Sequence, residues 1–481
     1  MWLERRGFDG GKAVALGAAG SLVLGNKVIA VWTANGPEAL QLEVKDLVGQ
    51  RVLKLASPFS VLFGDGRVVE AGAMRVLERA VVEELKAEPG ASRAAERVGG
   101  KAVRAVVEDE ASGLRVVWRV ELRDGSEYVR ESVALTAGAK DVEIKRVRLV
   151  DVSVVSGIED ARVVGTVAGS PIVAGNFFLG FEHPRSLSRV VRGEGIAELE
   201  RVLPPPKGQS VTYSAVVGVV PTGQMRRGFL TYVERERAHP YRTFLHYNSW
   251  YDLGYFTPYD EAGALDRVKV FGEELVKKRG LTLDSFLFDD GWDDHASLWR
   301  FNSGFKQGFT PVTEAAKGYG FAPGVWMSPW GGYSKPKQER LTLGKAAGFE
   351  IEQGGFALSG PKYYGRFRDV CLEMMAKYGV NQFKFDGTGN VNRVVAGSKF
   401  DSDFDAMIHL IGELREAKPD LYVNLTTGTT ASPFWLRYAD SIWRGGEDDD
   451  FAGWGQGGSD GLRVGMRRRM KKWWRRGRCF R

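Results

Sequence analysis

The pattern of apolar and polar positions changes near residue 240 and divides the chain into two regions. From about residue 20 to 235, valine-rich runs of five to eight residues are separated by glycine, aspartate and asparagine. A succession of short strands bounded by such turn residues predicts an antiparallel β-sandwich, which we expect over residues 1–240. The clearest expected strands are 39–47, 115–122, 127–135, 141–154 and 211–220, whereas 74–88 is expected to be helical.

Strand-like runs alternate with helical periodicity beyond residue 240. The expected strands are 243–250, 285–289, 322–327, 382–386, 422–425 and 441–443, and the expected helices are 260–279, 337–347, 363–378 and 403–418. Such alternation predicts a parallel sheet, and six strands with reactive groups at their ends favour an incomplete (β/α)8 TIM barrel over residues 241–450. A doubly wound sheet is the alternative, but no glycine-rich phosphate-binding pattern follows an early strand.

Charged and aromatic residues close several of these strands. Lys384 and Asp386 lie two residues apart, so they should point the same way where their strand meets a loop, and the lysine would favour the ionised carboxylate. Other strands end in carboxylates or indole rings, at Trp250, Asp289, Asp290, Trp326, Glu447 and Asp448. Carboxylates accept hydrogen bonds from hydroxyls and aromatic faces pack against the C–H faces of a pyranose, so the pattern predicts a sugar pocket.

The adjacent aspartates Asp289 and Asp290 raise a geometric question. Neighbouring residues of a strand point to opposite faces of the sheet. Both carboxylates reach one sugar only if the strand ends between them, which the following Gly291 permits.

Composition describes an ordinary globular protein with an unusual tail. The chain has 481 residues, 43% of them hydrophobic, and a formal charge of +7. The segment 463–481 contains ten Lys or Arg and no Asp or Glu, so the rest of the chain carries 7 − 10 = −3. We interpret 451–481 as an aberrant basic tail, produced by a shifted reading frame rather than selected as an arm that binds nucleic acid.

Cysteine content and hydropathy exclude two further classes. Two cysteines, Cys371 and Cys479, do not make a disulfide framework. No run approaches the roughly 20 apolar residues that span a bilayer, and residues 13–25 fit a first strand better than a signal peptide. We expect no membrane or nucleic-acid partner and no cofactor, whereas cytoplasmic and secreted locations both stay open.

Four sequence motifs, in order along the chain, resemble those of the clan of retaining α-galactosidases and α-N-acetylgalactosaminidases, glycoside hydrolase families 27 and 36. They are Asn248-Ser249-Trp250, Asp289-Asp290-Gly291-Trp292, Lys384-Phe385-Asp386-Gly387, and Trp443-Arg444 followed by Asp448. The resemblance covers about residues 240 to 450, and the upstream β region is similar to the one that precedes the barrel in family 36.

The resemblance implies a retaining hydrolase that cleaves terminal α-galactoside linkages of an oligosaccharide or glycoconjugate. The reaction would pass through a covalent glycosyl-aspartate, with Asp386 as nucleophile and Asp448 as general acid/base. Glu447 is the alternative to Asp448. The implied substrate-binding residues are Trp250, Asp289, Asp290, Trp326, Lys384 and Arg444.

The chain also departs from the family pattern. Thr388 follows the nucleophile motif where family 27 often has a cysteine, and residues 424–429 match neither a galactose-selective nor an acetamido-selective pattern. The sugar therefore stays open. A transglycosylase, a truncated carbohydrate-binding relative and a metal-dependent barrel hydrolase are the alternatives, and His295 is the one candidate metal ligand worth testing.

Overall fold

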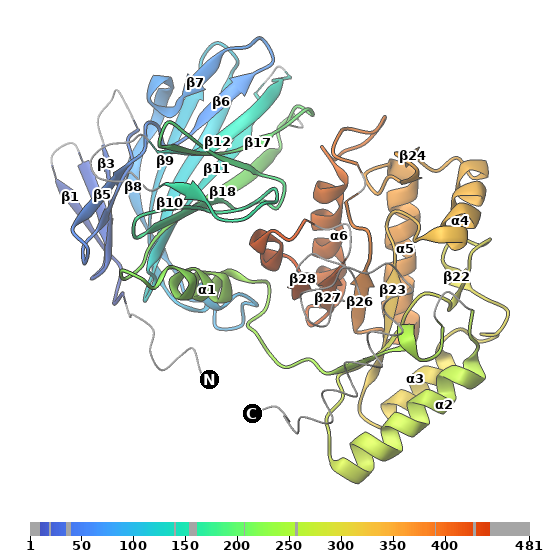
Figure 1. Cartoon of the computed structure of the whole chain (residues 1–481). Coiled ribbons are helices and arrows are strands. Elements are labelled where there is room, and N and C mark those ends of the chain that lie inside the picture. Colours follow the sequence, from blue (N-terminus) through green and yellow to red (C-terminus); the bar gives the residue numbers. More distant parts are fainter. Residues whose placement is uncertain are drawn as a thin grey trace. The chain divides into compact units, whose positions relative to one another are not determined.

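A computed structural model describes most of the chain (Figure 1). It describes residues 10–18, 21–34, 40–138, 141–152, 161–205, 207–254, 258–389, 391–426 and 430–442. All of these residues belong to the first of two compact units, which spans residues 1–442. Asp448, Arg444, Glu447 and Cys479 lie outside the described residues.

Antiparallel sheets make up the first half of the chain, as the succession of short valine-rich runs predicts. The first five strands form a meander in which each strand pairs with the next: β1 Val14–Ala18, β2 Ser21–Gly25, β3 Ile29–Ala34, β4 Glu43–Asp46 and β5 Arg51–Lys54. An eight-stranded sheet has the order β13-β14-β15-β18-β11-β10-β9-β8, and a five-stranded sheet has the order β16-β17-β12-β6-β7. Their bounds are β6 Ser60–Phe63, β7 Val68–Glu70, β8 Arg75–Leu85, β9 Gly100–Asp109, β10 Leu114–Arg123, β11 Tyr128–Thr136, β12 Ile144–Val152, β13 Arg162–Val163, β14 Ile172–Ala174, β15 Phe177–Phe181, β16 Leu187–Val191, β17 Glu194–Glu200 and β18 Ser210–Val219.

The period-two pattern of β10 shows how these sheets acquire a core. Leu114, Val116, Trp118, Val120 and Leu122 are buried, and four of the five residues between and after them are partly exposed. Because successive side chains of a strand point to opposite faces, one face of β10 joins the apolar core shared by the antiparallel sheets.

The expected helix at 74–88 is wrong, because Arg75–Leu85 is the edge strand β8. It pairs antiparallel with β9, with register shifts between Val76 and Val81. Its acidic side chains form ion pairs with arginines of the neighbouring strands, including Glu78 with Arg104 and Arg115. Backbone pairing with β9 therefore overrode the helix-like spacing.

The second half of the chain contains a curled six-stranded parallel sheet, a half-barrel. Its order is β19-β20-β23-β26-β27-β28, and every neighbouring pair is parallel. The strands are β19 His246–Asn248, β20 Ser285–Phe288, β23 Ala322–Met327, β26 Gln382–Phe385, β27 Tyr422–Leu425 and β28 Ser441–Ile442. The helices that connect them, visible in Figure 1, are α2 Glu261–Phe271, α3 Thr310–Lys317, α4 Ser334–Ala346, α5 Pro361–Tyr378 and α6 Asp403–Ala417. All six predicted strands and all four predicted helices of this region are present.

Short-range signals explain where these helices begin and end. The side chain of Asp260 accepts a hydrogen bond from the backbone of Gly263 and so caps α2. Ser402 caps α6 in the same way. Pro361 starts α5, and Gly379, with a φ of 66°, ends it in the left-handed conformation that glycine adopts easily.

Buried charges connect the antiparallel sheets to the half-barrel. Glu182, which directly follows β15, pairs with Arg130 of β11 and with Arg437, the last residue of a short 3-10 helix, Pro433–Arg437. Arg130 also pairs with Glu236 at the end of helix α1, Met225–Glu236. These groups form a chain of alternating charge that joins segments far apart in the sequence.

Two expectations concerned cysteine and membranes. Cys371 is buried in α5 as a free thiol, and burial raises the pKa of that thiol well above its usual value. Among the described residues, none of the helices has the length and apolar character that a membrane crossing requires.

Candidate active site

Three aspartates lie at the carboxyl ends of the parallel strands. Asp386 follows β26 directly, and Asp289 and Asp290 follow β20. The three residues are 5%, 1% and 3% exposed, respectively. In barrel enzymes this end of the sheet carries the catalytic groups, so the fold places the predicted carboxylates where such chemistry is found.

Asp386 is held by three uncharged donors. Tyr333 donates its phenolic O–H to Oδ1 at 2.7 Å, and Thr426 donates its hydroxyl to the same oxygen at 3.2 Å. The indole Nε1 of Trp326 donates to Oδ2 at 3.1 Å. Hydrogen bonds to both oxygens fix the plane of the carboxylate.

Glycine is required directly after Asp386. Gly387 has a φ of 76°, in the left-handed region. A Cβ added there would lie 2.0 Å from the Trp330 ring. The strand can therefore turn sharply past Asp386 only because this residue has no side chain.

Asp289 forms an ion pair with Lys384. The lysine Nζ lies 2.7 Å from Asp289 Oδ2, an interaction that spans β20 and β26. The backbone N–H of Asp289 donates to Ser249 Oγ at 2.8 Å, which ties this loop to the Asn248-Ser249-Trp250 motif. Lys384 was expected to act on Asp386, and the structure shows that it has a carboxylate partner, Asp289, at the end of another strand.

Asp290 turns away from Asp289 and towards α4. Strand β20 ends at Phe288, before both aspartates, so the strict alternation of a strand no longer applies to them. Asp290 Oδ1 accepts a hydrogen bond from Arg340 Nη2 at 3.0 Å. Burial raises the pKa of Asp290; Arg340 opposes this effect and the neighbouring Asp293 adds to it.

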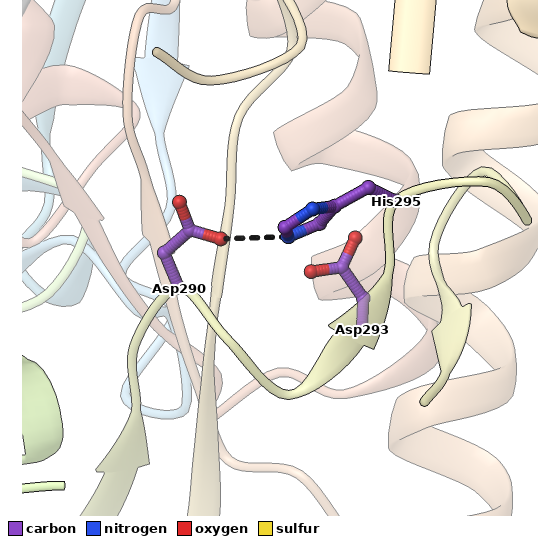
Figure 2. A group of neighbouring side chains, drawn as sticks. All are labelled: Asp290, Asp293 and His295. Atoms are coloured by element: carbon purple, nitrogen blue, oxygen red, sulfur yellow. Dashed lines mark ion pairs between the residues drawn. The ribbon is translucent and has the colours of Figure 1, made fainter. Parts of the chain in front are cut away.

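Figure 2 shows Asp290 and Asp293 close to His295, the residue singled out as a possible metal ligand. Their ligand atoms lie within 4.8 Å of one another. However, Arg340 Nη2 also lies 2.7 Å from Asp293 Oδ1, so one guanidinium binds both carboxylates. A divalent cation at this position would face a fixed positive charge, so the cluster fits an ion-pair network better than a metal centre.

The two predicted pocket tryptophans differ in their surroundings. Trp250 lies in a short 3-10 helix, Ser249–Tyr251, after β19 and is partly buried. Trp326 is only 2% exposed, and its ring packs against Arg340 and Trp299. In the structure Trp326 therefore holds Asp386 through its N–H, and its ring is largely covered by protein. The other two predicted site residues, Asp448 and Arg444, lie outside the described residues.

Sequence reasoning missed four residues of this site. Tyr333 and Thr426 bond to Asp386, Arg340 bonds to Asp290, and Ser249 accepts the backbone N–H of Asp289. Thr426 lies in the polar segment 424–429 that did not match the family pattern. Tyr333 and Arg340 lie in the connection and helix after β23, where no local pattern marks them.

Comparison with known proteins gives a clear result only for structure. No protein-family model and no curated protein matches the sequence. The family 36 α-galactosidase AgaB from Geobacillus stearothermophilus aligns with a TM-score of 0.62 and 13% identity over 90% of this chain and 75% of its own. An α-galactosidase from Lactobacillus brevis aligns with a TM-score of 0.56 and 13% identity over 91% of this chain and 73% of its own. A variant of AgaA from Geobacillus stearothermophilus, in complex with raffinose, aligns with a TM-score of 0.55 and 14% identity over 90% of this chain and 75% of its own.

The chain therefore has the fold of the family 36 α-galactosidases over about nine-tenths of its length. The resemblance to this clan, inferred from four short motifs, is confirmed at the level of the fold. Similarity of this kind establishes the fold, and the assignment of an activity has to come from the site itself.

Proposed function

We propose that the chain is a retaining glycoside hydrolase that acts on terminal α-galactoside linkages, with Asp386 as its nucleophile. The observation that carries this proposal is the environment of Asp386. The carboxylate lies at the end of a parallel strand, and neutral donors bind both of its oxygens. These donors fix the plane of the carboxylate, and a nucleophile must be oriented in this way.

The reaction would proceed in two displacements. Asp386 attacks the anomeric carbon while a carboxylic acid donates its proton to the departing glycosidic oxygen, and a glycosyl-aspartate ester forms. The conjugate carboxylate then takes a proton from water, which attacks the anomeric carbon and releases Asp386. The two carboxyl groups of retaining enzymes lie about 5 Å apart. By resemblance we assign the acid/base role to Asp448 and place Arg444 near the 2-position of the sugar.

Recognition of the sugar would fall to Asp289, Asp290 and Lys384. Lys384 Nζ donates to Asp289 Oδ2, and we assign both groups to ring hydroxyls, the lysine as a donor and Asp289 as an acceptor. Asp290 Oδ2 is buried and has no partner among the residues that the structure describes, so it can accept from a further hydroxyl. Trp250 would supply an aromatic face.

We further propose that residues 241–450 form the catalytic part, an incomplete TIM barrel, and that residues 1–240 form an accessory β-sandwich. An oligosaccharide is the expected substrate class, since structural neighbours were crystallised with raffinose and stachyose. The charge chain through Glu182 and Arg437 would fix the accessory region to the catalytic part.

The proposal is tested by nitrophenol release from α-galactoside and α-N-acetylgalactosaminide substrates. Wild-type protein should release nitrophenol from one of them, and Asp386→Asn should abolish release. Asp369→Asn is a matched control, because Asp369 is an exposed carboxylate on α5 that pairs with Arg368. Equal turnover in wild type and Asp386→Asn would refute the assignment of the nucleophile, and silence of the wild type on both substrates would refute the proposed activity.

A further inference from the structure

Arg340 is a fully buried cation beside the candidate site. Its side chain, on α4, has no exposed surface. The guanidinium binds Asp293 through Nε at 3.0 Å and through Nη2 at 2.7 Å. Nη2 also donates to Asp290 Oδ1 at 3.0 Å, and Nη1 donates to the carbonyl of Gly331 at 3.1 Å.

Two aromatic rings pack beside this guanidinium. The central carbon lies 4.4 Å from the ring centroid of Trp299 and 5.6 Å from that of Trp326. Since Trp326 donates to Asp386, Arg340 contacts both a predicted sugar-binding carboxylate and the indole that holds the proposed nucleophile.

The backbone around Trp299 is strained in a way that supports this arrangement. Leu298 and Trp299 have φ values of 54° and 70°, which are unfavourable for residues with a side chain. Two contacts hold this segment: Arg366 donates to the Leu298 carbonyl, and Trp299 Nε1 lies 3.3 Å from the Tyr363 hydroxyl. Such strain persists only where the surrounding contacts hold the backbone in place. Here the strained conformation places the Trp299 indole against Arg340.

We propose that Arg340 is a positioning residue of the active site. By holding Oδ1 of Asp290, it directs the unpartnered Oδ2 of that carboxylate to a substrate hydroxyl, and by packing on Trp326 it keeps the indole N–H on Asp386. The planar fork of an arginine makes these contacts together, and a lysine ammonium cannot. The kinetic consequences of this inference rest on the proposed function, whereas the positions of Asp290 and Trp326 do not.

The structural part is tested by crystal structures of wild type and of two variants. We expect the Asp290 carboxylate to rotate and Trp326 to move away from Asp386 in Arg340→Lys. A second variant combines Arg340→Met with Asp293→Asn, which removes one cation and one carboxylate together and so keeps the net charge of the cluster. Unchanged positions of Asp290 and Trp326 in either variant would overturn the proposal, whatever the activity of the protein.

The kinetic part compares substrates that differ by one hydroxyl. We expect Arg340→Lys to lower kcat/KM for the galactoside by about 10- to 100-fold, mostly through KM, and to abolish discrimination against the monodeoxy substrate that lacks the hydroxyl bound by Asp290. In an Asp290→Asn background the same change should have little further effect on KM. Additive losses, or unchanged discrimination, would overturn the positioning role.

Arg415→Lys is the matched control for loss of a buried arginine. Arg415 on α6 pairs with Asp440, which precedes β28 and so lies at the amino end of the parallel strands. Its replacement should lower stability without changing KM or deoxy discrimination. Absence of turnover by the wild type would count against the proposed hydrolase, and the crystal structures would still decide whether Arg340 positions Asp290 and Trp326.

Discussion

Tyr333 donates a hydrogen bond of 2.7 Å to Oδ1 of Asp386. The tyrosine directly precedes α4, in the connection that follows β23, whereas the aspartate ends the neighbouring strand β26. The parallel order of β23 and β26 brings these two chain segments to the same edge of the sheet. The position of the proposed nucleophile therefore depends on the loop after β23.

Replacing Tyr333 with phenylalanine should lower kcat/KM about 10- to 100-fold, because it removes one of the donors that orient the carboxylate. The loss should appear mainly in kcat, measured by nitrophenol release. Tyr364→Phe is a suitable control, since its hydroxyl bonds to Glu413 on the helix layer. Equal effects of the two changes would show that the hydroxyl of Tyr333 has no special role.

Replacing Gly387 with alanine should cost activity through geometry alone. The new Cβ would collide with Trp330, and alanine disfavours a φ of 76°. We expect a loss of at least about tenfold in kcat/KM, with a decrease in stability on the order of 1–3 kcal/mol. Gly365→Ala on α5, where a Cβ meets nothing within 4 Å, should be neutral or stabilising by comparison. Thermal unfolding and steady-state kinetics of both variants provide the test.

Glu182 should be a main determinant of acid stability. Burial is the largest single effect and acts to raise the pKa of Glu182, but the charges and hydrogen bonds of Arg130, Arg437 and Ser214 together outweigh it, so the pKa lies below its usual value. A group of this kind contributes stability that is present above its unfolded pKa, near 4.5, and is lost as pH falls below it.

Glu182→Gln leaves both arginines without this counter-charge and should cost about 3–5 kcal/mol at neutral pH. The difference in unfolding free energy between wild type and variant should shrink towards acid pH. Glu84→Gln removes an exposed ion pair with Lys101 and should cost less than about 1 kcal/mol. A pH-independent difference for Glu182→Gln would contradict the electrostatic explanation.

Glu127 should have the opposite pH dependence. Burial raises the pKa of Glu127 to about 7, against the effect of Arg227 and Arg235. The native state then binds the proton more tightly than the unfolded state, so stability declines as pH rises from about 4.5 to about 7. Glu127→Gln mimics the protonated form and should be more stable than wild type at pH 8, by up to about 3 kcal/mol, and similar to it at pH 4. Chemical denaturation measures the free energy of unfolding of both proteins at the two pH values. An equal difference between them at pH 4 and pH 8 would contradict this explanation.

Sequence alone predicted most of the half-barrel. Its strands are continuous apolar runs with glycine or charge at their ends, and its helices have clear caps at Asp260, Ser402 and Gly379. These are local signals, which a single sequence reveals. The error at 74–88 arose because strand β8 depends on pairing with β9, which follows it in the chain, and a single sequence does not reveal such pairing.

The candidate site was predictable only in part, for a related reason. Asp289, Asp290 and Asp386 can be recognised in the sequence because they are carboxylates at the ends of expected strands. Their partners Tyr333 and Arg340 cannot be recognised in this way, because they are separated in sequence from Asp386 and Asp290 by 53 and 50 positions, respectively. Such partners are set by the order in which strands and helices lie along the sheet, which is a property of the whole fold.

The most direct test of Asp386 as a glycosidase nucleophile is to trap the covalent intermediate with an activated fluoro-α-galactosyl fluoride and to map the labelled peptide by mass spectrometry. The fluorine slows hydrolysis of the ester, so the glycosyl-enzyme accumulates. We predict the mass of one fluoroglycosyl group on the peptide that contains Asp386, and no label on Asp386→Asn. Labelling of a different carboxylate, or turnover of a galactoside without any labelled peptide, would contradict the account.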